Sequence, residues 1–212
     1  MLLIGMFDSP FVRRVAIALK LLGVPFEHAN WSVGKDFARI REFNPLGRVP
    51  TLVLPNGEKL MESSAILDHI DELVGPERAL LPPSGPDRRQ ALNLMAMATG
   101  AAEKGVAQMY ERIFRPEAKR HQPWVDRLSL QMTASLAAID RYLGERGGAQ
   151  WLVGKRMTQA DITAVCAFTF LNDSLRVAAD AAMLQSLQML ASRCEAMPAF
   201  AETRVPFVPP RG

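Results

Sequence analysis

The sequence contains no apolar run close to the roughly twenty residues that a membrane-spanning helix requires. Its opening, MLLIGMF, is short and has no basic residues ahead of the apolar segment, so we expect no secretory signal. Cysteine occurs only at Cys166 and Cys194, far apart and within apolar helical patterns. With no CxxC pair, neither a disulfide framework nor a thiol redox motif is expected. These absences favour a cytoplasmic protein with two reduced thiols in or near its core.

The sequence also has few histidines and no dense cluster of basic residues. The three histidines, His28, His69 and His121, show no ligand spacing, so we expect no metal site. The 25 basic and 22 acidic residues are interspersed and leave a net charge of +3, without the dense basic block typical of nucleic-acid binding. The 49% hydrophobic and 22% charged content is that of a globular protein, and 212 residues suffice for one large or two small domains.

The most informative stretch is residues 44–66, NPLGRVPTLVLPNGEKLMESSAI. Residues 51–54 are β-branched or aliphatic, the PNG segment has the composition of a tight turn, and residues 59–61 return as a short strand. An apolar series at helical spacing starts at Ile66. The stretch therefore predicts a β-hairpin whose second strand runs directly into a helix.

Glu62 and Ser63 stand at that strand-to-helix junction. The first turn of a helix carries unpaired N–H groups and a partial positive charge, so Ser63 is placed to bind a carboxylate. Glu62 is placed to bind an ammonium group, and together the two residues suit the head of an α-amino acid. The alternative is that Ser63 or Ser64 only caps the helix while Glu62 lies in solvent.

Pro50 opens the strand that begins at Thr51, where a missing N–H is tolerated. Val49 before it could offer its own N–H and C=O to an extended peptide. A cis Val49-Pro50 bond would direct those groups outward, and the sequence leaves the isomer open.

The first half of the chain predicts a mixed four-stranded sheet with helices. Ser9 is a good helix N-cap, and Pro10 is favoured at the first helical position. A strand, helix and strand in succession imply a parallel pair. Besides the hairpin, we expect strands at 2–7 and 24–29 and helices at 10–22, 37–43 and 64–74.

The second half predicts only helices. Residues 75–87 have four prolines, two glycines and no periodicity, so we expect a linker there. Thr158 and Asp161 match the capping-box pattern, which we interpret as a folding signal. The expected helices are residues 88–114, 124–142, 159–171 and 184–197.

Five motifs in this order and spacing together resemble a glutathione S-transferase: SPFVRRV after the first strand, NPLGRVPTL, ESSAI, the proline-rich linker and TQADIT. The resemblance covers nearly the whole chain. It implies a thioredoxin-like α/β domain at residues 1–78 that binds glutathione, and an all-helical domain at residues 87–212 that helps to bind an electrophile. It also implies a homodimer. The interspersed charges and the lack of a long apolar run, rather than the resemblance, predict no nucleic-acid or membrane partner.

The resemblance assigns the glutathione site residue by residue. Val49 resembles the residue whose backbone pairs with the cysteine of glutathione, and Pro50 the cis-proline that follows it. Glu62 and Ser63 resemble the pair that binds the γ-glutamyl head, in agreement with the charge argument. Arg48 lies where many relatives have a basic residue, so it is a candidate for the glycyl carboxylate; the alternative is a solvated arginine.

Ser9 is the predicted catalytic residue, because SPF resembles the serine-type members, particularly plant tau-like and related bacterial proteins. In those members a serine after the first strand donates a hydrogen bond to the glutathione sulfur. A thiol with a pKa near 8.5 is mostly protonated at neutral pH, and a helix N-terminus lowers that pKa and favours the nucleophilic thiolate. The alternative is that Ser9 is only an N-cap.

No cysteine or tyrosine lies in residues 1–78, which disfavours the cysteine-type members with thiol-transfer chemistry and the tyrosine-type classes. Phe11, Met109, Tyr110 and Phe114 could line an apolar electrophile pocket. The alternative for Phe11 and Tyr110 is a place in the core. The predicted function is conjugation of the glutathione thiolate to apolar electrophiles. The alternatives are a glutathione-dependent isomerase or peroxidase, or a non-catalytic interaction protein with this fold.

Overall fold

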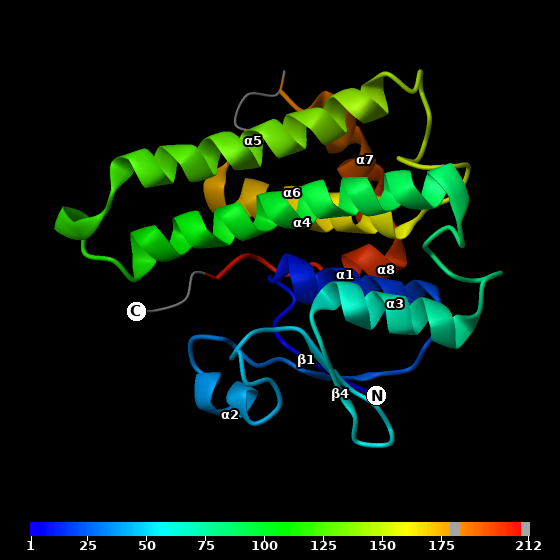
Figure 1. Cartoon of the computed structure of the whole chain (residues 1–212), viewed down its shortest axis with the longest axis horizontal. Helices are drawn as coiled ribbons and strands as arrows, with labels where there is room; N and C mark the ends of the chain where they lie inside the picture. Colours follow the sequence, from blue (N-terminus) through cyan, green and yellow to red (C-terminus); the bar gives the residue numbers. More distant parts are fainter. Residues whose placement is uncertain (179–182, 209–212) are drawn as a thin grey trace.

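The computed structural model describes residues 1–178 and 183–208. Its helices and strands alternate in the first third of the chain, and helices alone follow (Figure 1). In chain order they are β1 (Leu2–Ile4), α1 (Pro10–Leu21), β2 (Glu27–Ala29), α2 (Phe37–Arg41), β3 (Thr51–Val53), β4 (Lys59–Met61), α3 (Ser63–Val74), α4 (Gly85–Ile113), a 3-10 turn (Glu117–Lys119), α5 (Gln122–Gly144), α6 (Gln159–Leu175), α7 (Gln185–Glu195) and α8 (Pro198–Ala201).

The four strands form one mixed sheet in the order β2-β1-β3-β4. β1 pairs in parallel with β2 and antiparallel with β3, and β3 and β4 form the predicted hairpin. Gly57 takes the positive φ of +86° that the hairpin turn requires. The predicted four-stranded sheet and its parallel β1-α1-β2 unit are thus confirmed.

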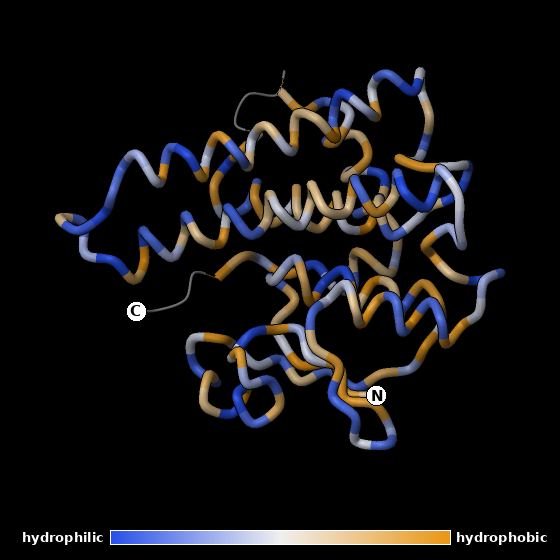
Figure 2. Tube along the Cα trace, in the orientation of Figure 1, coloured by the Kyte–Doolittle hydropathy of each residue, from blue (hydrophilic) through white to orange (hydrophobic). Residues whose placement is uncertain are grey.

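Helices α1 and α3 lie between the sheet and the bundle of α4 to α7, as Figure 1 shows. Two hydrophobic cores result: a smaller one between the sheet, α1 and α3, and a larger one inside the helical half. Helix α1 contributes to both, because Ile17 packs in the helical core while Val15 and Leu19 pack against the sheet. Apolar and polar residues alternate along the long helices in Figure 2, as expected for helices with one buried face.

Most element boundaries differ from the predicted ones by a few residues. The strands predicted at 2–7 and 24–29 are shorter, Leu2–Ile4 and Glu27–Ala29, and the helix predicted at 159–171 continues to Leu175. Residues 85–87, predicted as linker, form the first turn of α4, because Pro86 is well tolerated there. The 3-10 turn and α8 are too short to leave a periodic pattern and were not predicted. The capping box is present: Thr158 and Asp161 exchange side-chain and backbone hydrogen bonds at the start of α6.

Candidate active site

A cavity of about 360 Å³ lies between the sheet-containing half and the helical half. Ser9 and Asp8 line it from the start of α1, and Arg48 and Val49 line it from the loop before β3. The rest of the wall is mostly apolar and includes Met6, Phe11, Phe37, Val106, Met109, Tyr110, Phe114, Phe170, Phe207 and Val208. The cavity therefore combines one polar corner with a large apolar wall, the pattern of a small-molecule site.

Ser9 is the N-cap of α1 and faces this cavity. Its Oγ accepts a long hydrogen bond, 3.4 Å, from the backbone N–H of Val12. No acceptor for its own O–H is found in residues 1–178 or 183–208, so the hydroxyl can donate to a ligand. The sequence left capping and catalysis as alternatives for Ser9. The geometry allows both, because a lone pair of the oxygen accepts the Val12 N–H while the hydroxyl hydrogen can be donated to a ligand.

Asp8, which the sequence did not single out, is half-buried beside Ser9. Its Oδ2 accepts a hydrogen bond from the backbone N–H of Val208 at 3.3 Å. Its Oδ1 is shielded from solvent and has no hydrogen-bond partner among the described residues. Burial raises the pKa of this carboxyl, against the lowering effect of its backbone hydrogen bonds.

The Val49-Pro50 peptide bond is cis, which settles the isomer that the sequence left open. Val49 lines the cavity, while Pro50 is buried. Gly5 packs behind them at a φ of +131°, where a Cβ atom would lie 2.5 Å from Val12 Cγ2 and 2.8 Å from Val49 Cβ. Only glycine fits at this close approach of β1's end to the Val49 loop.

Glu62 and Ser63 lie at the junction of β4 and α3, as predicted. Glu62 is the N-cap residue, with a φ of 67° and an exposed side chain that makes no capping hydrogen bond. Neither Ser63 nor Ser64 caps α3: each hydroxyl instead accepts a 2.8 Å hydrogen bond from Nη2 of the buried Arg14. No side chain in the described part of the chain caps the first-turn N–H groups of α3, so these groups can donate to a ligand.

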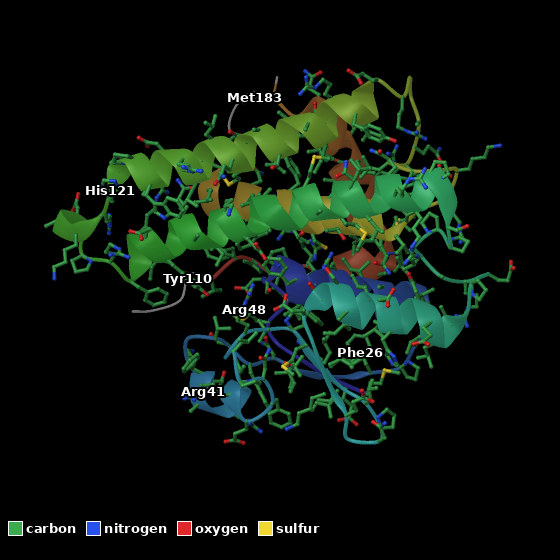
Figure 3. All side chains as sticks on the ribbon, in the orientation of Figure 1. Phe26, Arg41, Arg48, Tyr110, His121 and Met183 are labelled. Atoms are coloured by element: carbon green, nitrogen blue, oxygen red, sulfur yellow. The ribbon has the colours of Figure 1, made fainter. Side chains whose placement is uncertain are left out.

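Arg48 lies at the rim of the cavity, between α4 and the sheet-containing half in Figure 3, with a half-exposed side chain. Its guanidinium is 3.7 Å from Glu62 and 4.0 Å from Glu103. Exposed ion pairs at such distances contribute little to stability, so Arg48 is free to turn toward a ligand anion.

Phe11 and Tyr110 both line the cavity. Tyr110 is 39% exposed and packs edge-on against Phe114, with the ring centroids 5.1 Å apart. It therefore belongs to the cavity wall rather than to the core; Phe11 packs against the helical core as well. Burial raises the pKa of the Tyr110 phenol, although Arg48 opposes the shift, so the hydroxyl stays protonated.

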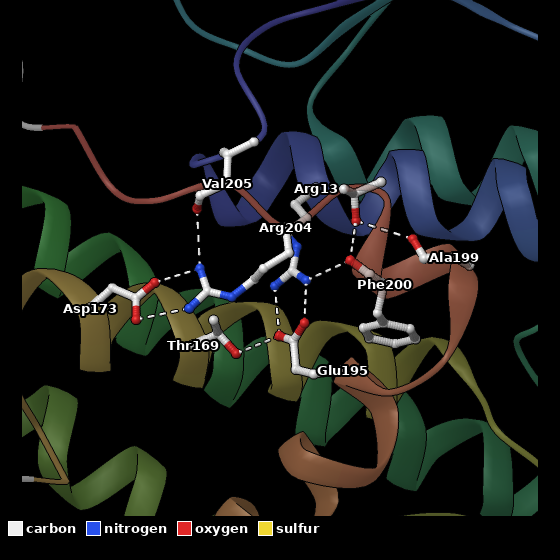
Figure 4. A network of polar contacts seen from close by, with 9 residues as sticks. Arg13, Thr169, Asp173, Glu195, Ala199, Phe200, Arg204 and Val205 are labelled. Carbon is white, nitrogen blue, oxygen red and sulfur yellow. Dashed lines mark hydrogen bonds and ion pairs between the residues drawn. The ribbon is translucent and has the colours of Figure 1, made fainter.

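Residues 203–208 follow α8, and Phe207 and Val208 line the cavity. The sequence did not indicate this contribution because the segment has no periodicity. Phe207 packs edge-on against Phe170 on α6, at 5.8 Å between centroids. Arg204 anchors the segment through paired hydrogen bonds to Asp173, 2.6 and 3.0 Å long (Figure 4). Both aromatic rings line the cavity.

Within the described ranges, no group of three or more His, Cys, Asp or Glu side chains could bind a metal ion. Cys166 and Cys194 are buried free thiols, and burial raises the pKa of each to about 12. None of the described helices is both long enough and apolar enough to cross a membrane.

Comparison with known families decides the relationship. The model for the glutathione S-transferase N-terminal domain matches residues 3–78, and that for the C-terminal domain matches residues 105–198. An uncharacterized GST-like protein, YibF of Escherichia coli (strain K12), is 31% identical over 172 residues, which are 81% of this chain and 82% of that protein. The chain belongs to the glutathione S-transferase superfamily.

Solved glutathione S-transferases share its fold over almost the whole chain. One from Methylobacterium radiotolerans JCM 2831, in complex with glutathione sulfonate, has a TM-score of 0.89 and 34% identity, covering 98% of this chain and 95% of that chain. A family member from Pseudomonas fluorescens Pf-5 with bound glutathione has a TM-score of 0.84 and 27% identity, covering 98% and 99%. Glutathione S-transferase U2 of Arabidopsis thaliana is 40% identical over 70 residues, 33% of this chain and 31% of that protein.

The family resemblance and the thioredoxin-like fold with its helical second domain are therefore confirmed. The assignment to a serine-type, tau-like class and the roles of individual site residues stay predictions.

Proposed function

We propose that this protein is a cytoplasmic, serine-type glutathione S-transferase that conjugates the glutathione thiolate to apolar electrophiles. The observation that carries the proposal is the position of Ser9. Its O–H, which has no acceptor among the described residues, lies with the N-terminus of α1 and Val49 at one cavity whose remaining wall is mostly apolar. Relatives with 34% and 27% identity have been crystallised with glutathione sulfonate and glutathione, which supports glutathione as the co-substrate.

In the proposed mechanism glutathione extends from the α3 N-terminus to the α1 N-terminus. Its γ-glutamyl head binds at Glu62 and Ser63, its cysteine pairs with the Val49 backbone beside cis-Pro50, and its glycyl carboxylate meets Arg48. The Ser9 hydroxyl donates a hydrogen bond to the sulfur, and the helix N-terminus adds a partial positive charge; both favour the thiolate over the thiol. The thiolate then attacks an electrophile that lies against Phe11 and Tyr110.

The first test compares wild type with Ser9→Ala. We expect Ser9→Ala to reduce turnover about tenfold to a hundredfold with little change in glutathione affinity, since it removes a hydrogen bond made mainly to the charged thiolate. The pKa of the bound thiol, followed by ultraviolet absorbance of the thiolate, should rise. Ser9→Thr retains a hydroxyl and should recover part of the activity. Ser84→Ala, at the exposed N-cap of α4, is a matched control that removes a hydroxyl remote from the cavity.

Unchanged turnover in Ser9→Ala would show that Ser9 does not have this role. The transferase proposal would then require another group that donates a hydrogen bond to the thiolate. Failure of wild type to bind glutathione would favour the non-catalytic alternative. If glutathione binds and its thiol pKa is lowered but no conjugation is found, isomerase and peroxidase substrates should be screened, because those reactions use the same thiolate.

Membership of the superfamily also supports two further parts of the proposal, a homodimer and a role in detoxification. Light scattering after size-exclusion chromatography tests the first: a mass near twice the 23.4 kDa of the chain is expected.

A further inference from the structure

Residues 204–208, here called the wall segment, bring a part of the far end of the chain to the cavity. Arg204, at its start, binds Asp173 of α6 through two hydrogen bonds of 2.6 and 3.0 Å (Figure 4). Phe207 lines the cavity and packs edge-on against Phe170, also on α6. These contacts attach the start and the middle of the wall segment to the helical half.

The end of the wall segment is attached to the other half, through Asp8. The backbone N–H of Val208, which also lines the cavity, donates to Asp8 Oδ2 at 3.3 Å, across 200 positions of sequence. Among the described residues, Phe207 and Val208 make no other hydrogen bond. Val208 is 65% exposed, so burial contributes little to its position. The hydrogen bond to Asp8 is therefore the contact that keeps Val208 at the cavity.

The sequence of the wall segment favours an extended chain that one hydrogen bond can hold. Residues 205–208 read VPFV and are followed by two further prolines. A residue before a proline is restricted to extended conformations, which applies to both Val205 and Val208. A chain restricted in this way loses less conformational entropy when it is fixed. Because proline has no N–H, neither of the two residues after Val208 can replace its donor.

Asp8 is well placed to serve as the acceptor. It directly precedes Ser9, the N-cap of α1, and its side chain is half-buried. Its Oδ1 is shielded from solvent, while Oδ2 accepts the Val208 N–H. One side chain thus lies next to the proposed catalytic hydroxyl and also binds the wall segment.

We propose that Asp8 is a positioning residue for the electrophile: it binds Val208 and so keeps the wall segment in place as a surface for an extended apolar group next to the sulfur. The inference rests on the proposed function, because it takes the cavity beside Ser9 to bind the electrophile. Asp8 acts through the wall segment and does not itself touch the electrophile. The substrates that depend on it are those whose apolar part reaches from the reacting atom to Phe207.

The test measures the binding of two thioethers of glutathione by isothermal titration calorimetry. S-methylglutathione and S-hexylglutathione have no ionisable thiol and differ only in the length of the apolar chain on the sulfur. Wild type should bind S-hexylglutathione about tenfold or more tightly than S-methylglutathione, since each methylene group that leaves water adds to the affinity. Val208→Pro removes the N–H donor. It should weaken S-hexylglutathione binding about threefold to tenfold and leave S-methylglutathione binding within about twofold of wild type.

Three further variants separate the hydrogen bond from other effects. Val208→Ala keeps the N–H and should bind both ligands within about twofold of wild type. Asp8→Ala removes the acceptor and should show the same selective loss as Val208→Pro, and combining the two changes should add no further loss, because both remove one bond. Asp8→Asn has a side-chain carbonyl that can still accept the N–H, so it should retain the preference for S-hexylglutathione.

The inference would be overturned by equal loss for both ligands, by selective loss in only one of Val208→Pro and Asp8→Ala, or by a loss in Val208→Ala as large as in Val208→Pro. Wild type that binds glutathione without preferring S-hexylglutathione over S-methylglutathione would also overturn it and leave glutathione as the co-substrate. Failure of wild type to bind glutathione at all is a separate result, because it would overturn the proposed function and this inference with it.

Discussion

Ser9 and Asp8 are neighbouring side chains that would act on the same bound thiol in opposite directions. In the proposed mechanism the Ser9 hydroxyl favours the thiolate, whereas an ionised Asp8 in the same cavity would disfavour a second negative charge. Burial raises the pKa of Asp8 and so moderates this penalty at the acidic end of the pH range.

Replacing Asp8 should therefore make the thiol more acidic. For Asp8→Asn we expect the pKa of bound glutathione to fall by about one unit, because the like charge is removed. The side-chain carbonyl of the asparagine can still accept the Val208 N–H, so the segment over the cavity is retained. Thiolate absorbance against pH measures the effect. The control is Asp68→Asn, on the exposed face of α3, which should leave the pKa of bound glutathione unchanged. If Asp8→Asn also leaves that pKa unchanged, Asp8 is too far from the sulfur to influence it.

At the same scale, the sequence pointed to some candidate site residues and gave no sign of others, for identifiable reasons. Ser9, Val49 and Glu62 stand in motifs with a local signal: a cap, a proline and a strand-to-helix junction. The burial of Arg14 was not predicted, because an arginine in a helix is normally solvated. One feature of the sequence could have indicated this burial: residues 12–19 are apolar apart from Arg13 and Arg14. The helix therefore has no polar face to expose to solvent there, which predicts that both arginines are buried.

At the scale of elements, the end of β1 is fitted to the Val49 loop through Gly5. Gly5→Ala should lower the free energy of unfolding by about 2 to 4 kcal/mol, because the new methyl group overlaps Val12 and Val49 and the φ of +131° is unfavourable. Glutathione affinity should fall as well, since Val49 must move. Urea unfolding and calorimetric titration measure the two effects.

Gly23→Ala provides the matched control for this substitution. Gly23 also has a positive φ, +65°, but no atom within 4 Å would meet an added Cβ. We expect a loss of about 1 kcal/mol in stability and no change in affinity. Equal loss of affinity in both variants would show that backbone strain, not the contact with Val49, is responsible.

The start of α6 depends on Asp161, whose buried carboxylate accepts hydrogen bonds from the N–H groups of Thr158 and Leu152 at 2.8 and 2.7 Å. Asp161→Asn should lower the free energy of unfolding by about 1 to 3 kcal/mol at neutral pH, because an amide group faces one of these donors.

The pH dependence of that loss has a defined sign. Burial is the main cause that raises the folded-state pKa of Asp161 above 3.8. A raised pKa means that the folded state binds the proton more tightly than the unfolded state. The contribution of Asp161 is therefore fully present only below its ordinary pKa of 3.8, and it declines as pH rises through the folded pKa. The stability difference between wild type and Asp161→Asn should thus widen on acidification from pH 7 to pH 4, as measured by urea unfolding. A difference that narrows would contradict the assignment.

At the scale of the whole molecule, helix α1 joins the sheet-containing half and the helical half, because it contributes residues to both hydrophobic cores. Helix α1 packs on the sheet with one side and on the helical half with the other, where Ile17 enters the larger core and Arg13 binds Glu195. We expect the full chain to unfold in a single cooperative transition. Residues 1–78 alone should lack a stable fold, since Ile17 and Arg13 would lose their partners in the helical half and Arg14 would lose its hydrogen bond to Thr163. Circular dichroism during thermal unfolding tests both; a folded fragment with its own transition would contradict the prediction.

Contacts between residues far apart in the sequence are also the part of the structure that the sequence did not predict. Periodicity, turns and caps predicted nearly all helices and strands, because those signals are local. The segment at 203–208, and its contacts with Asp8 and Phe170, depend on residues far apart in the sequence and have no local signal. Helix boundaries such as Gly85 shifted by a few residues because several positions there can begin a helix.

The separation between cavity wall and core has an evolutionary consequence. Tyr110 and Phe114 line the cavity from the last turns of α4, yet they belong to neither hydrophobic core and are 39% and 51% exposed. Substitutions at such positions usually change stability by about half a kcal/mol or less. New selectivity toward ligands can therefore arise here one mutation at a time, without passing through poorly folded intermediates, while Ser9 and Val49 remain fixed on the shared frame.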